Sequence, residues 1–264
     1  MDLGLADRTY VVTGGSSGVG LATVRALLDE GAHVATCGRD AERLKRIGEH
    51  ERLFTAVCDV RDADAVREFV HSAAEAFGGR SGRSGRVDGL VNNAGQSRMK
   101  RLDETTGDDW RDELELKFAG VLNPLQAARK HLAASDAASV VNVNAVLAKQ
   151  PETRLITTSA ARAGILNLSK SLSQELAADG IRVNSVCLGL VDTGQWTRRH
   201  AAADSGLSYE DWQAELAADR GIALGRLGRA EEVAYAILAL LSPRASYITG
   251  TSIDVCGGVG RGIL

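Results

Sequence analysis

A glycine-rich segment near the start of the chain has the residue types and spacing that bind phosphate groups. Thr13-Gly14-Gly15-Ser16-Ser17-Gly18-Val19-Gly20 follows the strand-like run Tyr10-Val11-Val12 and precedes a helical apolar pattern at Leu21, Val24, Leu27 and Leu28. Gly14 and Gly18 permit a tight turn, and Gly20 permits close packing of the helix. Ser16 and Ser17 add hydroxyl donors. Because the first N–H groups of a helix have no partner inside it, they can face a pyrophosphate, and the segment predicts a dinucleotide site.

Further polar groups follow other strand-like runs. Asp59 ends the third run, Asn92-Asn93-Ala94-Gly95 ends the fourth, and Val191-Asp192-Thr193 follows the sixth. Ligands of open α/β sheets bind beyond the carboxyl ends of the strands. These features favour a nucleotide site over a glycine-rich turn that binds no ligand.

Short β-branched runs alternate with helical patterns along the whole chain. The predicted strands are Thr9–Val12, His33–Cys37, Phe54–Cys58, Gly89–Asn92, Ser139–Val143, Arg182–Cys187 and Ser252–Val255. Seven such strands with helices between them predict an α/β fold in which a doubly wound parallel sheet has helices on both faces. The 264 residues fit a single domain, residues 1–264.

Composition excludes several classes of partner. The net charge of −3 gives no reason to expect a nucleic acid. The sequence shows no signal peptide and no apolar run near the roughly 20 residues that span a bilayer, so we expect a soluble, cytoplasmic protein that does not bind membranes. The five histidines lack metal-ligand spacing, so no metal is expected. The four cysteines lack a Cys-x-x-Cys pair and are interpreted as buried, reduced thiols.

Two segments interrupt the regular alternation. Residues 78–86 contain a doubled Arg-Ser-Gly unit and predict a flexible surface insert. Residues 194–224 contain Trp196, Tyr209 and Trp212 and predict a lid over a pocket, although simple packing on the domain is the alternative.

With Gly189 and the tail motifs Arg226-Leu-Gly-Arg-Ala-Glu-Glu-Val233, Tyr247-Ile-Thr-Gly250 and Gly257-Gly258, these features resemble the short-chain dehydrogenase/reductase family over nearly all of the chain. The resemblance implies a Rossmann-like subunit of a homo-dimer or homo-tetramer that binds NAD(H) or NADP(H) and a small-molecule substrate. The positions that it assigns to the cofactor are Gly14, Ser16, Ser17, Gly18, Val19, Gly20, Gly38, Arg39, Asp59, Val60, Asn93, Ala94, Gly95, Arg162, Gly189, Val191 and Thr193. Asp59 is expected at the adenine, with helix capping as the alternative.

The end of the second strand bears on the choice of cofactor. NAD-binding sheets place an acidic side chain there, whereas a 2′-phosphate requires a cation. Here Gly38 stands at the position of the acid and Arg39 follows it, which favours NADP(H). Asp40 lies one residue further on, so NAD(H) is the alternative if the strand ends later.

The catalytic positions depart from the family pattern. Arg162-Ala-Gly-Ile-Leu-Asn-Leu-Ser-Lys170 and Gly180-Ile-Arg-Val-Asn184 fix the alignment. The family's asparagine, serine, tyrosine and lysine then fall at Lys117, Ala145, Thr158 and Arg162, and Leu188 replaces a proline.

The replacement of the tyrosine changes the proton chemistry. Hydride transfer to a carbonyl needs a proton donor, and a phenol of pKa about 10 next to an ammonium suits that role. A threonine hydroxyl is far less acidic, and an arginine hardly exchanges a proton. Losing general acid catalysis lowers a rate by about 10²–10⁴-fold.

Four residues are candidates for a rearranged relay. Lys117 can act as the acid if burial near Arg162 lowers its pKa, or it can simply fill the space of the asparagine and bond a backbone carbonyl. Arg162 can reach the nicotinamide ribose. Asn144 can donate to a carbonyl or cap the strand end. Thr158 can bond the ribose or the substrate, or be satisfied within its own helix.

These features support three hypotheses. The first is an NADP(H)-dependent oxidoreductase with an atypical relay, acting on a small carbonyl, enone or quinone-like substrate. Enones and quinones depend less on a strong proton donor, since hydride transfer leaves a stable anion. The second is a catalytically silent nucleotide-binding subunit or sensor in a homo- or hetero-oligomer. The third is a non-redox lyase or epimerase.

Overall fold

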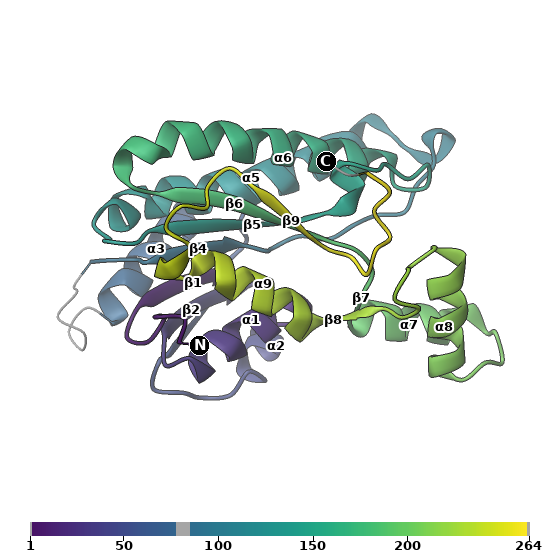
Figure 1. Cartoon of the computed structure of the whole chain (residues 1–264), viewed down its shortest axis with the longest axis horizontal. Helices are drawn as coiled ribbons and strands as arrows, with labels where there is room; N and C mark the ends of the chain where they lie inside the picture. The colour runs from purple at the N-terminus through teal and green to yellow at the C-terminus, as the bar shows by residue number, and fades with distance from the viewer. Residues whose placement is uncertain (1, 78–84, 263–264) are drawn as a thin grey trace.

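The computed structural model describes residues 2–77 and 85–262 and contains a seven-stranded parallel sheet in the order β3-β2-β1-β4-β5-β6-β9 (Figure 1). Its strands are β1 (Thr9–Thr13), β2 (His33–Gly38), β3 (Leu53–Val57), β4 (Gly89–Asn92), β5 (Ser139–Ala145), β6 (Arg182–Leu188) and β9 (Ser252–Val255). A separate pair joins β7 (Val191–Asp192) to β8 (Gly228–Arg229). The predicted doubly wound parallel sheet of seven strands is confirmed.

Helices cover both faces of the sheet (Figure 1). The helices are α1 (Gly18–Asp29), α2 (Ala41–Lys45), α3 (Ala63–Ala76), α5 (Gly107–Ala133), α6 (Ile156–Glu175), α7 (Gly194–Ala203), α8 (Tyr209–Asp219) and α9 (Ala230–Leu241). The buried side chains of α3, α5 and α6 pack in one core, and those of α1 and α9 pack in the other. Among the helices of the described residues, none has the length and apolar composition needed to cross a bilayer.

Each inner strand contributes to both cores because its side chains alternate. Val11 of β1 points to the face of α3, α5 and α6, while Tyr10 and Val12 point to the face of α1 and α9. This double burial explains why the strands consist of continuous apolar runs.

The strand order places the switch point of the sheet between β1 and β4, which pair in parallel. The chain leaves these neighbouring strands toward opposite faces, so a crevice opens beyond their carboxyl ends. The glycine turn after β1 and Asn93-Ala94-Gly95 after β4 lie at this crevice.

Several boundaries differ from those expected. β1, β2, β5 and β6 run one or two residues further than predicted, and β3 begins and ends one residue earlier. The β7–β8 pair was not predicted, because strands of two residues carry no periodicity. Cys37, Cys58 and Cys187 are buried as expected, but Cys256 is partly exposed. Of the predicted insert, residues 78–84 lie outside the described part of the chain.

Candidate active site

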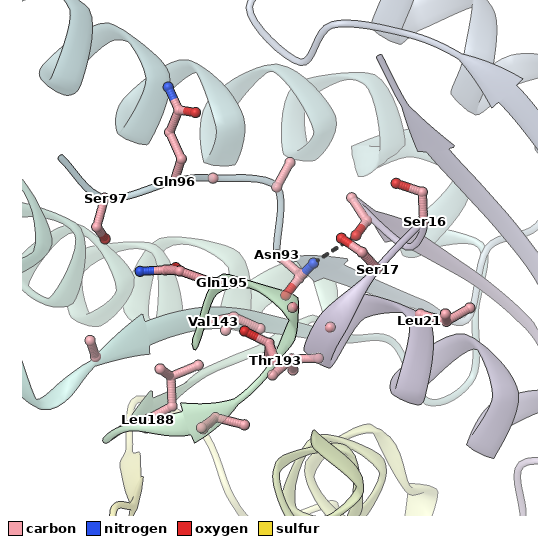
Figure 2. A pocket seen from close by; sticks show the side chains of 18 of the residues that line it. Ser16, Ser17, Leu21, Asn93, Gln96, Ser97, Val143, Leu188, Thr193 and Gln195 are labelled. Atoms are coloured by element: carbon pink, nitrogen blue, oxygen red, sulfur yellow. Dashed lines mark hydrogen bonds between the residues drawn. The ribbon is translucent and has the colours of Figure 1, made fainter. Parts of the chain in front are cut away.

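One cavity of about 1090 Å³ opens along the carboxyl edge of the sheet. Its wall is formed by the loops that follow β1, β2, β3, β4, β5 and β6, and by α7. Figure 2 shows Ser16 and Ser17 on the glycine turn, with Thr193 and Gln195 from the start of α7 also lining the cavity. All the predicted cofactor positions line this cavity except Gly20. Their contacts with a cofactor stay a prediction.

The glycine turn after β1 has no room for larger residues. Gly14 has a φ of 71°, and a Cβ there would lie 2.9 Å from the Cα of Ala94. A Cβ at Gly20 would lie 2.3 Å from the carbonyl oxygen of Gly14. Gly20 therefore shapes the turn from behind instead of lining the cavity.

The asparagine after β4 holds this turn in place. The Asn93 Nδ2 donates to the carbonyl oxygens of Thr13 and Gly14, at 3.0 and 3.1 Å. Figure 2 shows its side chain directed at the turn. The Thr13 Oγ1 in return accepts from the backbone N–H groups of Asn93 and Ala94. The two loops at the switch point are thus fastened to each other.

The first turn of α1 fits an anionic group. Ser17 is the N-cap, but its hydroxyl does not cap the helix, and the first turn contains no acidic residue. The N–H groups of this turn therefore face the cavity with the positive end of the helix dipole.

The end of β2 is basic. A Cβ at Gly38 would lie 3.2 Å from the Ser16 Oγ, so this position approaches the glycine turn closely. Arg25, Arg39 and Arg46 line the cavity, and none of the three forms a salt bridge with a described residue. Asp40 is instead the N-cap of α2: it accepts from the Arg43 N–H at 3.1 Å, and its other oxygen pairs with the Arg43 guanidinium.

Asp59 follows β3 and lines the same end of the cavity. Its carboxylate accepts from the backbone N–H and the guanidinium of Arg61, at 3.0 and 2.9 Å. These bonds to Arg61 lower the pKa of Asp59, so it is ionised at neutral pH. Its predicted contact with an adenine stays open.

Lys117, on α5, lines the cavity. Its side chain is 7% exposed, and its Nζ lies 3.3 Å from the Glu113 Oε1. The Nζ also donates to the backbone carbonyl of Gln96. Burial, and then the charge of Arg162, lower the pKa of Lys117 to about 8, while Glu113 opposes this shift. The residue thus bonds a backbone carbonyl and also has the depressed pKa expected of an acid.

Arg162 reaches the cavity from α6, and its side chain is partly buried. Its Nη1 lies 3.4 Å from the Asn144 Oδ1, a weak contact, and its Nε has no hydrogen bond within the described part of the chain. Burial lowers the pKa of this guanidinium. A buried donor without a partner costs about 1–3 kcal/mol, so this fork is suited to bind a ligand oxygen.

Asn144 and Thr158 lie behind the cavity wall and do not line it. The Asn144 Nδ2 donates to the Arg162 carbonyl at 3.0 Å, and its Oδ1 accepts from the Ala145 N–H. The Thr158 Oγ1 donates to the Glu113 Oε1 at 2.9 Å, not to its own helix. We therefore infer that both residues position their neighbours. Their predicted contact with a substrate stays a prediction, which their place behind the cavity wall does not favour.

The structure adds Glu113, which sequence reasoning missed. It is 3% exposed and accepts from both Thr158 and Lys117. It stands four residues before Lys117 on α5, so the two side chains share one face of the helix. The four-residue spacing of the acid and the lysine could have indicated this ion pair from the sequence. Such pairs are also common on exposed helices, so the spacing alone does not indicate a buried site. Glu113 supplies the negative charge that balances the buried cations.

At position 158, where the resemblance led us to look for a tyrosine, a threonine lies behind the cavity wall. Among the described residues that line the cavity there is no tyrosine. Tyr209, on α8, donates to Asp192 instead. Lys117 lines the cavity and, with a pKa of about 8, can exchange a proton near neutral pH, as a phenol of lowered pKa would.

Comparisons with known proteins extend these observations. Residues 14–260 match the family model described as enoyl-(acyl carrier protein) reductase. The chain is 37% identical to a cis-4-hydroxycyclohexanecarboxylate dehydrogenase of Sinomonas cyclohexanicum, over 96% of each chain.

Two solved structures share the fold over nearly the full length. One is an NADPH-bound short chain oxidoreductase of Pseudomonas aeruginosa PAO1 described as containing an atypical catalytic center. It is 47% identical, with a TM-score of 0.86 and coverage of 97% of this chain and 99% of that one. The other is L-sorbose reductase of Gluconobacter frateurii in complex with NADPH and L-sorbose, 27% identical with a TM-score of 0.90 over 100% of both chains.

Proposed function

The chain belongs to the short-chain dehydrogenase/reductase family, and from this premise we propose that it is an NADP(H)-dependent oxidoreductase whose proton donor is Lys117. The observation that carries the proposal is the buried ammonium of Lys117 in the cavity wall, where its pKa is lowered to about 8. Association into a homo-dimer or homo-tetramer is part of the same proposal.

Three features support NADP(H) as the cofactor. Gly38 leaves no acid at the end of β2, Arg39 beside it forms no salt bridge with a described residue, and the carboxylate of Asp40 is directed at Arg43. A 2′-phosphate at this end would meet cations, and the carboxylates that also line it, Asp40 and Asp59, are engaged by Arg43 and Arg61. The two structural relatives described above are NADPH complexes.

Replacing Arg39 by alanine tests whether the protein prefers NADP(H) to NAD(H). Charge-assisted hydrogen bonds contribute about 1.5–3 kcal/mol, so we expect the Kd for NADPH to rise about tenfold to a hundredfold. The Kd for NADH, which has no 2′-phosphate, should change little, and both can be followed by fluorescence of the reduced nicotinamide. A parent protein that binds NADH more tightly than NADPH would contradict this choice.

The bound cofactor supplies the hydride, and the residues of the chain control the proton. An ammonium has three N–H donors, and those of Lys117 reach Glu113 and the Gln96 carbonyl, which leaves one for a substrate oxygen. With a pKa of about 8, Lys117 is mostly protonated at neutral pH and can still release its proton. The free donors of Arg162 can bind a ribose hydroxyl and stabilise negative charge, although arginine itself does not transfer a proton.

We propose small carbonyl, enone or quinone-like compounds as substrates. An ammonium of moderate acidity can protonate a developing alkoxide, and an enolate or hydroquinone anion needs even less assistance. The relatives above are named for a hydroxycyclohexanecarboxylate and for L-sorbose, which are both polyfunctional alcohols or ketones of small size.

A substrate panel tests the function directly. Purified full-length protein with NADPH should lose nicotinamide absorbance with at least one ketone, enone or quinone. Stoichiometric oxidation of the cofactor with reduction of the substrate, measured by mass spectrometry, would support the oxidoreductase. Tight binding of NADPH without turnover across the panel would instead indicate the silent nucleotide-binding subunit, and conversion of a substrate without cofactor oxidation would indicate a lyase or epimerase.

A further inference from the structure

The end of the cavity formed by α7 and α8 is rich in arginine. Arg198, Arg199 and Arg220 line it, together with Trp196 and Glu152. This end lies in the same cavity as Lys117 and Arg162, so a substrate held there can extend toward the candidate proton donor. The helices that carry these arginines project from one side of the sheet (Figure 1).

Arg199 is the cation of this group that stacks on an aromatic ring, whereas Arg198 is exposed and Arg220 pairs with Glu152. Its guanidinium carbon lies 4.6 Å above the ring centre of Trp196, and within the described residues no carboxylate forms a salt bridge with it. Stacking on an indole face holds the plane of the guanidinium and leaves its edge donors free. Partial burial, and then the charges of Arg220 and Arg154, lower the pKa of Arg199, while the charge of Glu152 opposes this shift.

The nearby acids are already engaged by another arginine. Glu152 pairs with the Arg220 Nη1 at 2.9 Å, and Asp219 lies 3.6 Å from the Arg220 Nε. The Arg220 Nε is nonetheless buried without a hydrogen bond among the described residues. Arg199 is therefore a partly buried cation in a ligand cavity, next to further positive charge. Among the described residues, the acid that acts on it, Glu152, forms its salt bridge with Arg220 and not with Arg199.

We propose that Arg199 binds an oxyanion group of the substrate, a carboxylate or a phosphate, at the α7–α8 end of the cavity. The inference rests on the proposed function, because it assigns a substrate class to the same cavity. The fork of a guanidinium matches both groups with two parallel hydrogen bonds, and such bonds gain strength in a partly desolvated site. Trp196 would give the same site an apolar wall for the carbon skeleton beside the anion.

Binding of simple probes tests this inference without requiring turnover. We would titrate the NADPH-saturated full chain with benzoate, phenyl phosphate, their neutral analogue benzamide, and inorganic phosphate, with calorimetry or Trp fluorescence as the readout. Benzoate or phenyl phosphate should bind at least tenfold more tightly than benzamide. Arg199→Gln should raise the Kd for the organic anion at least tenfold and leave the Kd for NADPH unchanged.

Arg67→Gln is the matched control, because Arg67 lies on α3 outside the cavity and the substitution removes the same single charge. It should leave all four titrations unchanged. The stronger of the two organic anions identifies the group as a carboxylate or a phosphate. Equal affinity for benzamide, an unchanged anion Kd in Arg199→Gln, or inorganic phosphate binding as tightly as either organic anion would overturn the inference.

The outcomes also separate this inference from the proposed function. Arg199-dependent binding of an organic anion without any NADPH oxidation by the substrate panel would support the anion site and contradict the oxidoreductase. Turnover of a neutral ketone at a rate unaffected by Arg199→Gln, with no anion preference in binding, would retain the oxidoreductase and overturn the anion site.

Discussion

Lys117→Ala is expected to lower kcat about 100-fold or more with an otherwise active ketone substrate, within the range of about 10²–10⁴ that general acids contribute. The reason is that no tyrosine lines the described cavity and neither Thr158 nor Arg162 can supply a proton readily. The rate of NADPH oxidation measures the effect, and the Kd for NADPH should stay within a few fold of the parent value. A rate equal to that of the parent would remove Lys117 from the mechanism.

The pH profile gives an independent readout of the same residue. The ammonium is the acid, so the rate of carbonyl reduction should fall as the pH rises through about 8, where Lys117 loses its proton. The rate of alcohol oxidation should rise over the same range, because the neutral amine is then the base. In Lys117→Ala, neither the fall of the reduction rate nor the rise of the oxidation rate near pH 8 should be seen. Lys130→Ala, an exposed change on the same helix, should retain the parent rate and profile.

Glu113→Gln is expected to destabilise the fold by about 3–5 kcal/mol at neutral pH, the typical cost of breaking a buried ion pair. The substitution keeps the shape of the side chain but leaves the charges of Lys117 and Arg162 uncompensated. Chemical denaturation measures the free energy of unfolding. Since the carboxylate raises the pKa of Lys117, its loss should also move the pH limb of carbonyl reduction below 8.

The loss of stability in Glu113→Gln should shrink as the pH rises, because a neutral Lys117 needs no counter-charge. Glu115→Gln makes the same charge change two residues away on an exposed position of α5 and should alter neither the unfolding free energy nor the profile. A Glu113→Gln protein within about 0.5 kcal/mol of the parent, the usual range for surface changes, would show that the carboxylate does not balance the cations.

The sheet and the nucleotide edge were predictable because they depend on local patterns. Continuous apolar runs identified the strands, and Gly14 and Asn93 lie at the switch point because the ends of parallel strands meet there. The direction in which individual side chains point was harder to predict from the sequence. Asn144 stands between Val143 and Ala145, which both line the cavity, so strand alternation turns its side chain to the other face.

The charge balance of the site could not be derived from the sequence in the same way. An acid four residues before a lysine gives the same sequence pattern whether the helix face is exposed or buried. Only the packing of α5 against α6 shows that this face is buried. Arg199 and Arg220 are 21 positions apart in sequence, and the hairpin of α7 and α8 brings them to one cavity end. Contacts between residues so far apart in sequence leave no periodic pattern from which they could be predicted.

Glu113 and Lys117 share α5, and their partners Thr158 and Arg162 share α6, which packs against it. Both helices pack in the larger core, to which the hairpin of α7 and α8 contributes no buried side chain. The ionic arrangement is therefore complete in the resting protein and does not await an incoming molecule. Charges that are already in place need no rearrangement when a substrate binds, which keeps the cost of reorganisation low.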